Sequence, residues 1–135
     1  MRIALCIDKI GGMLFNNRRL SQDRILCEKL LSLLKDEESL WVNEYSAKLF
    51  EDTTKLKVDS CFLEKAQEKD ICFIETQAPS LEQVDELLVF CWNRQYPADT
   101  FFTLNPITEG FKKIKVETFE GFSHKKITLT IYRRA

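Results

Sequence analysis

Histidine is the scarcest chemically useful residue in this sequence, because His124 is the only one among 135 residues. A zinc site draws three or four ligands from cysteine, histidine and carboxylate side chains. With one histidine and no Cys-x-x-Cys pair, we do not expect a metal site. The five cysteines are scattered and mostly lie in apolar runs, which indicates reduced thiols in the core of a cytosolic protein.

Long apolar runs and a large net charge are also missing. No stretch approaches the roughly 20 apolar residues of a membrane helix, and the N-terminus lacks an apolar segment with a cleavage site. Lysine plus arginine number 20 against 21 for aspartate plus glutamate, so no overall charge attracts nucleic acid or an anionic membrane. We expect a soluble, cytoplasmic protein with no membrane partner, and nucleic acid is not an expected ligand.

Short apolar runs predict the centre of a sheet. Residues 3–7, 71–74 and 87–92 are continuous apolar stretches, typical of strands covered on both faces. Ser21 is a good N-cap for a helix that begins near Gln22, and its apolar stripe has helical spacing: Leu26, Leu30, Leu33 and Leu34. The alternation predicts a single α/β domain over residues 1–135, a mostly parallel central sheet flanked by helices.

The last part of the chain leaves one alternative open and predicts one pairing. Residues 80–92 fit either a short helix followed by a strand or one continuous helix, because nothing breaks the pattern. Residues 111–119 and 127–131 alternate between apolar and polar side chains, which predicts a C-terminal antiparallel hairpin at the sheet edge. The lysines and arginines of this hairpin would discourage aggregation of that edge.

The loop between the first strand and the helix concentrates polar side chains. Gly11 and Gly12 permit backbone conformations closed to other residues, and Asn16 and Asn17 tolerate left-handed geometry. The loop also carries amides and guanidinium groups suited to a phosphate or carboxylate, namely Asn16, Asn17, Arg18, Arg19, Gln22 and Arg24. A solvated loop is the alternative interpretation. Asp23 follows in the first helical turn, where the helix dipole by itself favours an anion.

Several motifs together resemble dihydrofolate reductase in a compacted form. They are residues 2–8 followed by Gly-Gly-Met at 11–13, the helix with Asp23, Pro-Ala-Asp-Thr-Phe-Phe at 97–102 and Phe-Glu-Gly-Phe-Ser-His at 119–124. The resemblance implies that fold, with Asp23 holding a heterocyclic ring and Thr100 supporting its carboxylate. It makes these residues the candidate ligand site: Met13, Asn17, Arg18, Arg19, Asp23 and Thr100.

The departures from that family concern the cofactor. The reductases bind NADPH with glycine-containing turns after two of their strands, where this chain has Glu44 and Glu75. A phosphate needs close backbone approach and no nearby anion, so these glutamates argue against NADPH in the usual pose. No cofactor is therefore expected.

A second resemblance is to small Firmicutes proteins that carry a ribonuclease Z label. It lies in residues 13–24 and in Trp-Asn-Arg-Gln-Tyr-Pro-Ala-Asp at 92–99. True ribonuclease Z is a two-zinc hydrolase with several histidine ligands, and His124 alone cannot supply them. The label therefore does not fit, and a hydrolase acting on nucleic acid is the least favoured function. His124 has no nucleophile and orienting group beside it in the sequence, which favours a turn histidine.

Two classes of function remain. The first is a small-molecule site near Asp23 for a heterocyclic or nucleotide-like ligand, without the usual NADPH site. The second is a non-enzymatic module that binds a protein partner on a degenerate reductase scaffold. The polar loop favours the first and the missing glycines favour the second, so the sequence leaves open whether the chain is an enzyme.

Overall fold

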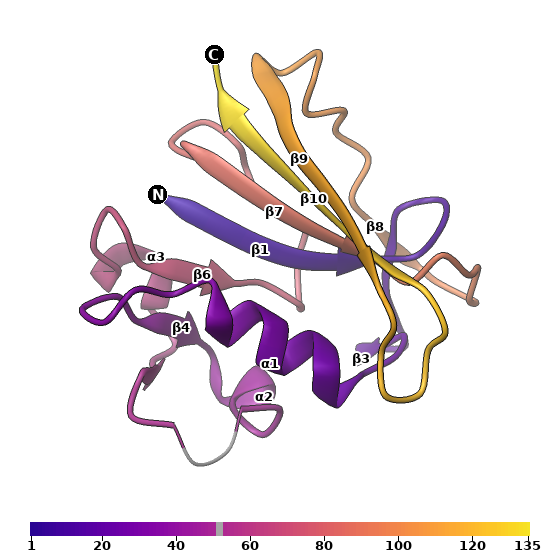
Figure 1. Ribbon diagram of the computed structural model, residues 1–135, viewed down its shortest axis with the longest axis horizontal. Coiled ribbons are helices and arrows are strands. Elements are labelled where there is room, and N and C mark those ends of the chain that lie inside the picture. Colours follow the sequence, from indigo (N-terminus) through magenta and orange to yellow (C-terminus); the bar gives the residue numbers. More distant parts are fainter. Residues whose placement is uncertain (51–52) are drawn as a thin grey trace.

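A large sheet organises the computed structural model, which describes residues 1–50 and 53–135 (Figure 1). Its strands are β1 (Arg2–Ile7), β4 (Leu40–Val42), β5 (Leu56–Val58), β6 (Ile71–Phe73), β7 (Glu86–Cys91), β9 (Phe111–Phe119) and β10 (Ile127–Arg134). These seven strands lie in the order β5-β4-β6-β1-β7-β10-β9. The apolar run at residues 3–7 therefore forms a central strand, as predicted.

The pairing is parallel except at the C-terminal hairpin. β1 pairs in parallel with β6 and with β7, so that Arg2 lies beside Ile71 on one side and beside Glu86 on the other. β10 is antiparallel to both β7 and β9. The predicted α/β fold, a mostly parallel sheet that ends in an antiparallel hairpin, is confirmed.

A second, smaller sheet was not predicted. It has the order β3-β2-β8 and consists of β2 (Gly12–Phe15), β3 (Arg18–Arg19) and β8 (Thr100–Phe101). Asn16 and Asn17 form the turn between β2 and β3 with φ of 50° and 61°, the left-handed geometry that two-residue hairpin turns require. The expected loop is thus a hairpin, and strands this short leave little periodic signal in a sequence.

The helices are short and α1 is the longest of them. They are α1 (Arg24–Ser32), α2 (Glu44–Ala47) and α3 (Phe62–Lys65). The N-cap of α1 is Asp23 and not Ser21, because the Asp23 side chain accepts from the backbone N–H groups of Ile25 and Leu26. The helix therefore begins two residues later than predicted.

Residues 80–85 contain no helix, so the helix expected there in both alternatives is wrong and only the strand part of the first is present. The Arg134 guanidinium donates to the carbonyl oxygen of Val84 at 2.9 Å and also to that of Leu81. The segment instead forms a turn, in which the Val84 N–H donates to the Leu81 carbonyl at 3.3 Å, and Arg134 of β10 holds that turn in place. The strand interpretation of residues 87–92 is confirmed, with β7 occupying Glu86–Cys91.

The core lies on both faces of the large sheet. α1 covers one face (Figure 1). On that face Leu26 and Leu30 pack with strand residues such as Leu88 and Leu129. The cluster on the other face includes Met13 of β2, Phe62 of α3 and Phe111 of β9, together with Leu81, Val84 and Phe102. In the described residues, no helix is long and apolar enough to cross a membrane.

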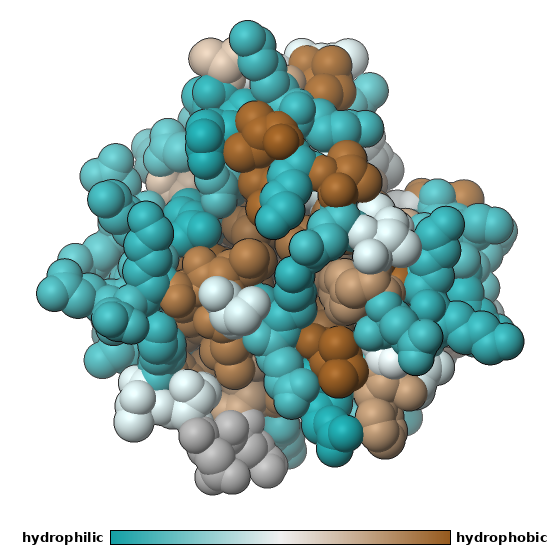
Figure 2. Space-filling model, in the orientation of Figure 1, coloured by the Kyte–Doolittle hydropathy of each residue, from teal (hydrophilic) through white to brown (hydrophobic). Residues whose placement is uncertain are grey.

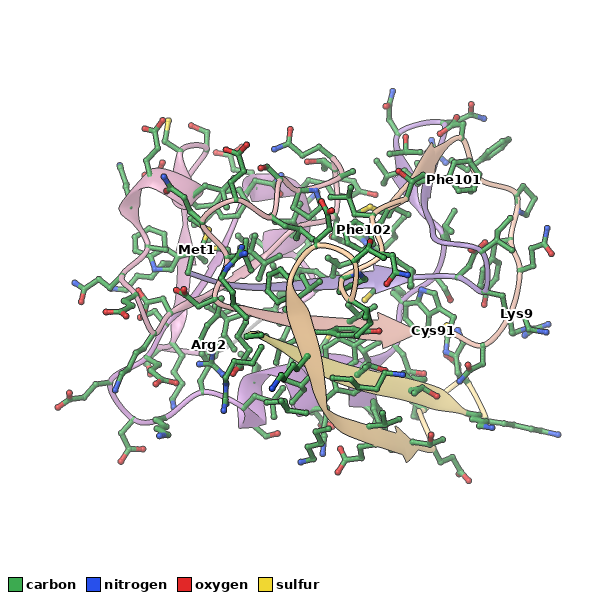
Figure 3. The ribbon with its side chains drawn as sticks, turned by 90° about the horizontal axis from the view of Figure 1, so that it is seen from above. Met1, Arg2, Lys9, Cys91, Phe101 and Phe102 are labelled. Atoms are coloured by element: carbon green, nitrogen blue, oxygen red, sulfur yellow. The ribbon has the colours of Figure 1, made fainter. Side chains whose placement is uncertain are left out.

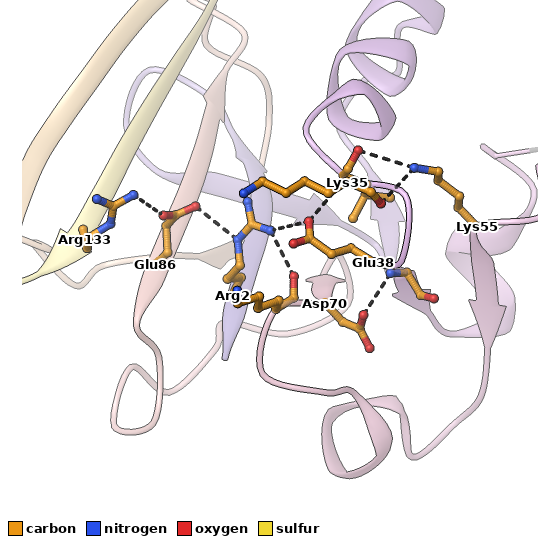
Figure 4. Close-up of polar contacts among 10 residues, drawn as sticks. Arg2, Lys35, Glu38, Lys55, Asp70, Glu86 and Arg133 are labelled. Atoms are coloured by element: carbon orange, nitrogen blue, oxygen red, sulfur yellow. Dashed lines mark hydrogen bonds and ion pairs between the residues drawn. The ribbon is translucent and has the colours of Figure 1, made fainter.

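Ion pairs tie together the amino ends of the central strands (Figure 4). Arg2 lies 3.2 Å from Glu38 and 3.2 Å from Glu86, and it also donates to the carbonyl oxygen of Lys69. Glu86 also pairs with Arg133 of β10 at 3.1 Å. These groups hold the sheet together at the end where β1 begins.

Candidate functional site

The loop that leaves β1 is shaped by Asp8, which is completely buried. One of its oxygens accepts from the N–H groups of Gly12 at 2.7 Å and Ile10 at 3.0 Å, and the other accepts from the N–H of Tyr96 at 3.1 Å. A buried carboxylate needs such donors, so Asp8 fixes the start of the β2 hairpin and the segment after β7 together. This arrangement positions Arg18 and Arg19.

Asp23 joins the beginning of α1 to the loop between β9 and β10. Besides capping the helix, its carboxylate accepts from the N–H groups of Phe122 and Ser123, both at 2.9 Å, and lies 2.8 Å from Nδ1 of His124. Gly121 permits this close approach, since a Cβ there would lie 2.6 Å from Oδ2 of Asp23. The Asp23 side chain is 0% exposed, so these contacts enclose the carboxylate completely.

The pKa of Asp23 lies far below its ordinary value. Burial by itself raises that pKa, but hydrogen bonds from His124 and from the N–H groups of Phe122, Ser123 and Leu26 lower it more strongly. The prediction that Thr100 donates a hydrogen bond to Asp23 is wrong, because the Thr100 hydroxyl donates to Asp99 at 3.4 Å instead. The loop of residues 121–124 supplies the donors that Thr100 was expected to supply.

His124 is more than a turn histidine. Its Nε2 lies 2.7 Å from the Ser21 hydroxyl, and its Nδ1 faces the Asp23 carboxylate. A serine, a histidine and an aspartate in this order have the connectivity of a hydrolytic triad. Ser21, however, borders a cavity of about 10 Å³, the space of about one water molecule. The arrangement links the segment before α1 to the 121–124 loop through polar contacts.

The side chains of this small cavity come from the carboxyl ends of β1 and β6 and from the polar loop. They are Cys6, Met13, Arg19, Leu20, Ser21, Ile74, Glu75 and Trp92. Arg19 pairs with Glu75 at 2.9 Å and stacks over the Tyr45 ring, while the Ser46 hydroxyl donates to Glu75 at 2.7 Å. Glu75 is buried, so its charge is neutralised inside the protein.

A separate open groove lies at the carboxyl ends of β1 and β7. It measures about 440 Å³ and is lined by Trp92, Asn93, Arg94, Ser123, His124, Lys125 and Lys126. The buried part of its lining is Trp92 and His124, whose ring centroids lie 4.5 Å apart with the planes tilted by 33°. Arg94, Lys125 and Lys126 are exposed, and none of them forms an ion pair with another described residue.

The groove is built on an ordered turn. Asn93 has φ of 59°, and its side-chain amide donates to the Thr128 hydroxyl at 2.9 Å and to the Lys126 carbonyl at 3.2 Å. The Lys9 N–H donates to the carbonyl of Arg94 at 2.9 Å. Figure 3 shows Lys9 and Cys91 at the end of the sheet away from Met1 and Arg2. The turn therefore gathers positive side chains at one end of the molecule.

The predicted site residues do not converge on one pocket. Met13 is part of the core, Asn17 is exposed in the β2–β3 turn, and Arg19 is engaged by Glu75. Arg18 lines an open hollow of about 510 Å³ beside Phe15 and Tyr96. Asp23 lies near the basic groove through Ser123 and His124, which line it, and Thr100 lines neither hollow.

Glu75 and His124 are the important residues that the sequence interpretation assigned differently. The sequence predicts that Glu75 opposes phosphate binding, and in the structure Glu75 is the ion-pair partner of Arg19. The sequence feature that could have indicated the role of His124 is Gly121. A glycine in a polar turn often marks a close approach of the backbone to another group, here the Asp23 carboxylate. In the part of the chain that the structure describes, no three histidine, cysteine, aspartate or glutamate side chains are grouped to hold a metal.

Comparison with known proteins identifies a similar fold. No protein-family model matches the sequence, and no curated protein matches it either. Among solved structures, dihydrofolate reductase from Enterococcus faecalis, in complex with NADP(H) and RAB-propyl, has a similar fold with a TM-score of 0.68. The match has 9% sequence identity and covers 98% of this chain and 95% of the reductase chain. The chain therefore has a dihydrofolate reductase-like fold.

Proposed function

We propose that this chain binds a small nucleotide-like ligand through its phosphate or carboxylate groups, in the basic groove beside Asp23 and His124. The observation that carries the proposal is the groove of about 440 Å³ that presents Arg94, Lys125 and Lys126 without an acidic lining residue. Guanidinium and ammonium groups are the usual partners of phosphate oxygens. The NADPH site of the reductases is not used in this proposal.

The position of the groove supports this choice. Ligands of open α/β sheets bind outside the carboxyl ends of the strands. A larger hollow of about 600 Å³ lies at the opposite end, and its lining includes Asp36, Glu37, Glu38, Glu68 and Asp70. An anion is repelled there and attracted to the basic groove, so charge selects between the two hollows.

Calorimetric titration with pyrophosphate, ATP and adenosine tests the proposal. We expect pyrophosphate and ATP to bind with dissociation constants of about 0.1 to 1 mM, weakening as salt is added. Adenosine, which lacks phosphate, should give no heat. The double variant Arg94→Ala/Lys126→Ala should weaken binding by about tenfold or more.

A matched control removes charge elsewhere. Lys112→Ala/Lys113→Ala changes two exposed lysines near the start of β9, outside the groove, and should leave binding unchanged. Equal losses in both double variants would contradict a defined site and indicate diffuse attraction. No heat from either anion would contradict the proposal itself.

A non-enzymatic protein-interaction module is the second candidate function. The observation that favours it is the close packing around Ser21 and Glu75. The cavity left between these side chains has a volume of about 10 Å³, which is too small for a heterocycle. Absence of any small-anion binding, together with a stable fold, would make this candidate the preferred one.

A further inference from the structure

The free edge of β9 is the longest unpaired strand edge among the described residues. β9 extends over 9 residues, pairs with β10 on one side and lies last in the sheet order. The opposite edge strand, β5, has 3 residues. A long open edge presents backbone N–H and C=O groups to another chain. Association through β9 is therefore the first possibility to consider.

The exposed apolar side chains of β9 add to this edge. Ile114 is 44% exposed and Val116 is 54% exposed, although both are β-branched residues suited to a packed strand. Figure 2 shows hydrophobic patches separated by hydrophilic side chains on the face over which β9 runs. Pairing along the edge would cover part of this apolar surface.

The charges along β9 identify the partner. Its first half is basic, with Lys112, Lys113 and Lys115, and its second half is acidic, with Glu117 and then Glu120 just beyond the strand. An antiparallel copy of the same strand presents its acidic half to the basic half. The edge is thus electrostatically complementary to itself, which an interface with two-fold symmetry requires.

We propose that two copies of this chain pair along their β9 edges, antiparallel, with Val116 opposite Val116 of the partner subunit on the two-fold axis. Lys115 of each copy then lies opposite Glu117 of the partner subunit, and directly opposite side chains in an antiparallel pair are close enough to interact. The two sheets become one continuous sheet. This inference is independent of the proposed ligand.

The charges also select this register over its neighbours. Moving the centre by one residue, to Lys115 or to Glu117, places two identical charges opposite each other. The pairing of β9 with β10 puts Lys115 and Glu117 on the same face of the sheet, beside Ile131 and Leu129. The lysines that oppose random edge pairing thus permit one specific pairing.

Lys29 of α1 strengthens the acidic half of the edge. It forms an ion pair with Glu117, which lowers the pKa of that carboxyl group and keeps it charged. In the proposed dimer, Glu117 lies between Lys29 of its own chain and Lys115 of the partner subunit. A single carboxylate can accept from both cations because its two oxygens offer several acceptor sites.

Sedimentation velocity on the full chain tests this pairing through charge reversal. The wild-type chain should show a mass that rises from one chain toward two with concentration. Lys115→Glu and Glu117→Lys should each remain monomeric, because each creates two like-charge pairs across the axis. The double variant Lys115→Glu/Glu117→Lys should dimerise again.

Mixing the two single variants gives the sharpest outcome. In an equal mixture, each Lys115→Glu chain meets a Glu117→Lys chain with opposite charges at both positions, so a mixed dimer should form. Failure to fold cannot mimic this recovery. The control Lys57→Glu reverses one exposed charge on β5, the opposite edge, and should leave the mass unchanged.

Three results would overturn the proposal. One is a wild-type chain that stays monomeric at all concentrations, and another is a dimer that Lys115→Glu does not weaken. The third is a pair of monomeric single variants that do not associate when mixed. If β9 bound an acidic peptide or nucleic acid while the chain stayed monomeric, the proposal would also be contradicted.

Discussion

The Asp23 carboxylate connects parts of the chain that lie 99 to 101 positions apart in the sequence. On one side it satisfies N–H groups at the start of α1, which otherwise have no partner in the helix. On the other side it fixes the 121–124 loop, whose Phe122 ring also stacks against the Arg24 guanidinium at 4.3 Å. This single side chain therefore orders the wall of the basic groove that Ser123 and His124 form.

The low pKa of Asp23 predicts a pH dependence of stability. In the unfolded chain the carboxyl titrates near its ordinary pKa of about 3.9, and in the folded protein its pKa is lower. The ionised form thus stabilises the fold above pH ~4, and this contribution is lost as the pH falls toward the folded pKa. Asp23→Asn should cost about 2 kcal/mol at neutral pH and flatten the loss of stability in acid.

Urea denaturation at neutral pH and at several pH values below ~4 measures this effect. Asp36→Asn is the matched control, since Asp36 is exposed and should change the unfolding free energy by less than about 0.5 kcal/mol. If Asp23→Asn and wild type lost stability in acid to the same extent, the carboxylate would not be the titrating group.

At the residue scale, sequence reasoning placed Asp23 at the start of the helix, but in the first turn and not at the N-cap, and gave its carboxylate the wrong partner. A carboxylate at a helix start is a local feature, and the sequence contains it. Its partner depends on which distant segment lies beside it, and two segments carry a hydroxyl group, β8 at Thr100 and the 121–124 loop at Ser123. Gly121, where a side chain would strike the carboxylate, was the signal that favoured the second loop.

At the scale of an element, the packing of α1 on the sheet depends on a few leucines. Leu30 is completely buried, with Leu26 and Leu34 beside it in the core on that face. Leu30→Ala should therefore lower the free energy of unfolding by about 2 to 5 kcal/mol. Leu104→Ala, the same change at a side chain that is 37% exposed, should have an effect below about 0.5 kcal/mol. Equal effects in chemical denaturation would show that α1 is packed differently.

The link between the β2–β3 hairpin and β6 depends on one ion pair, Arg19 with Glu75. Arg19→Leu leaves the Glu75 carboxylate buried without its cation, which should destabilise the fold by about 3 kcal/mol. The double variant Arg19→Leu/Glu75→Leu removes the stranded charge and should be more stable than Arg19→Leu alone. Thermal unfolding of both variants measures the difference. A double variant that is less stable than Arg19→Leu would show that the unpaired Glu75 carboxylate does not destabilise the fold.

The elements differed in how far the sequence determined them. β1, β6, β7 and the β9–β10 hairpin were predicted because continuous or alternating apolar residues mark them clearly. The β3-β2-β8 sheet was missed, since β3 and β8 have 2 residues each and depend on tertiary contacts. Asn16 and Asn17 nevertheless identified the turn, because their left-handed geometry is a local property.

At the scale of the whole molecule, the chain shares a dihydrofolate reductase-like fold with almost none of the sequence. The fold similarity extends over 98% of the chain at 9% identity, so the sheet order is kept by patterns of burial and not by particular residues. Arg19, Glu75 and Trp92 fill the space at the carboxyl ends of β1 and β6. Positive side chains instead surround an open groove next to it.

The last prediction concerns reductase chemistry. NADPH at micromolar concentrations should not bind, because Glu44 is exposed and Glu75 is buried where the reductases have glycine turns for phosphates. Folate should not bind at the Asp23 position that the resemblance implies, since the 121–124 loop encloses the Asp23 carboxylate. Calorimetry with each compound, and the absorbance of NADPH during incubation with dihydrofolate, measure these expectations, with an active dihydrofolate reductase as the positive control. A saturable NADPH isotherm at micromolar concentration that survives Arg94→Ala/Lys126→Ala would place the cofactor outside the basic groove and make an enzyme the preferred interpretation.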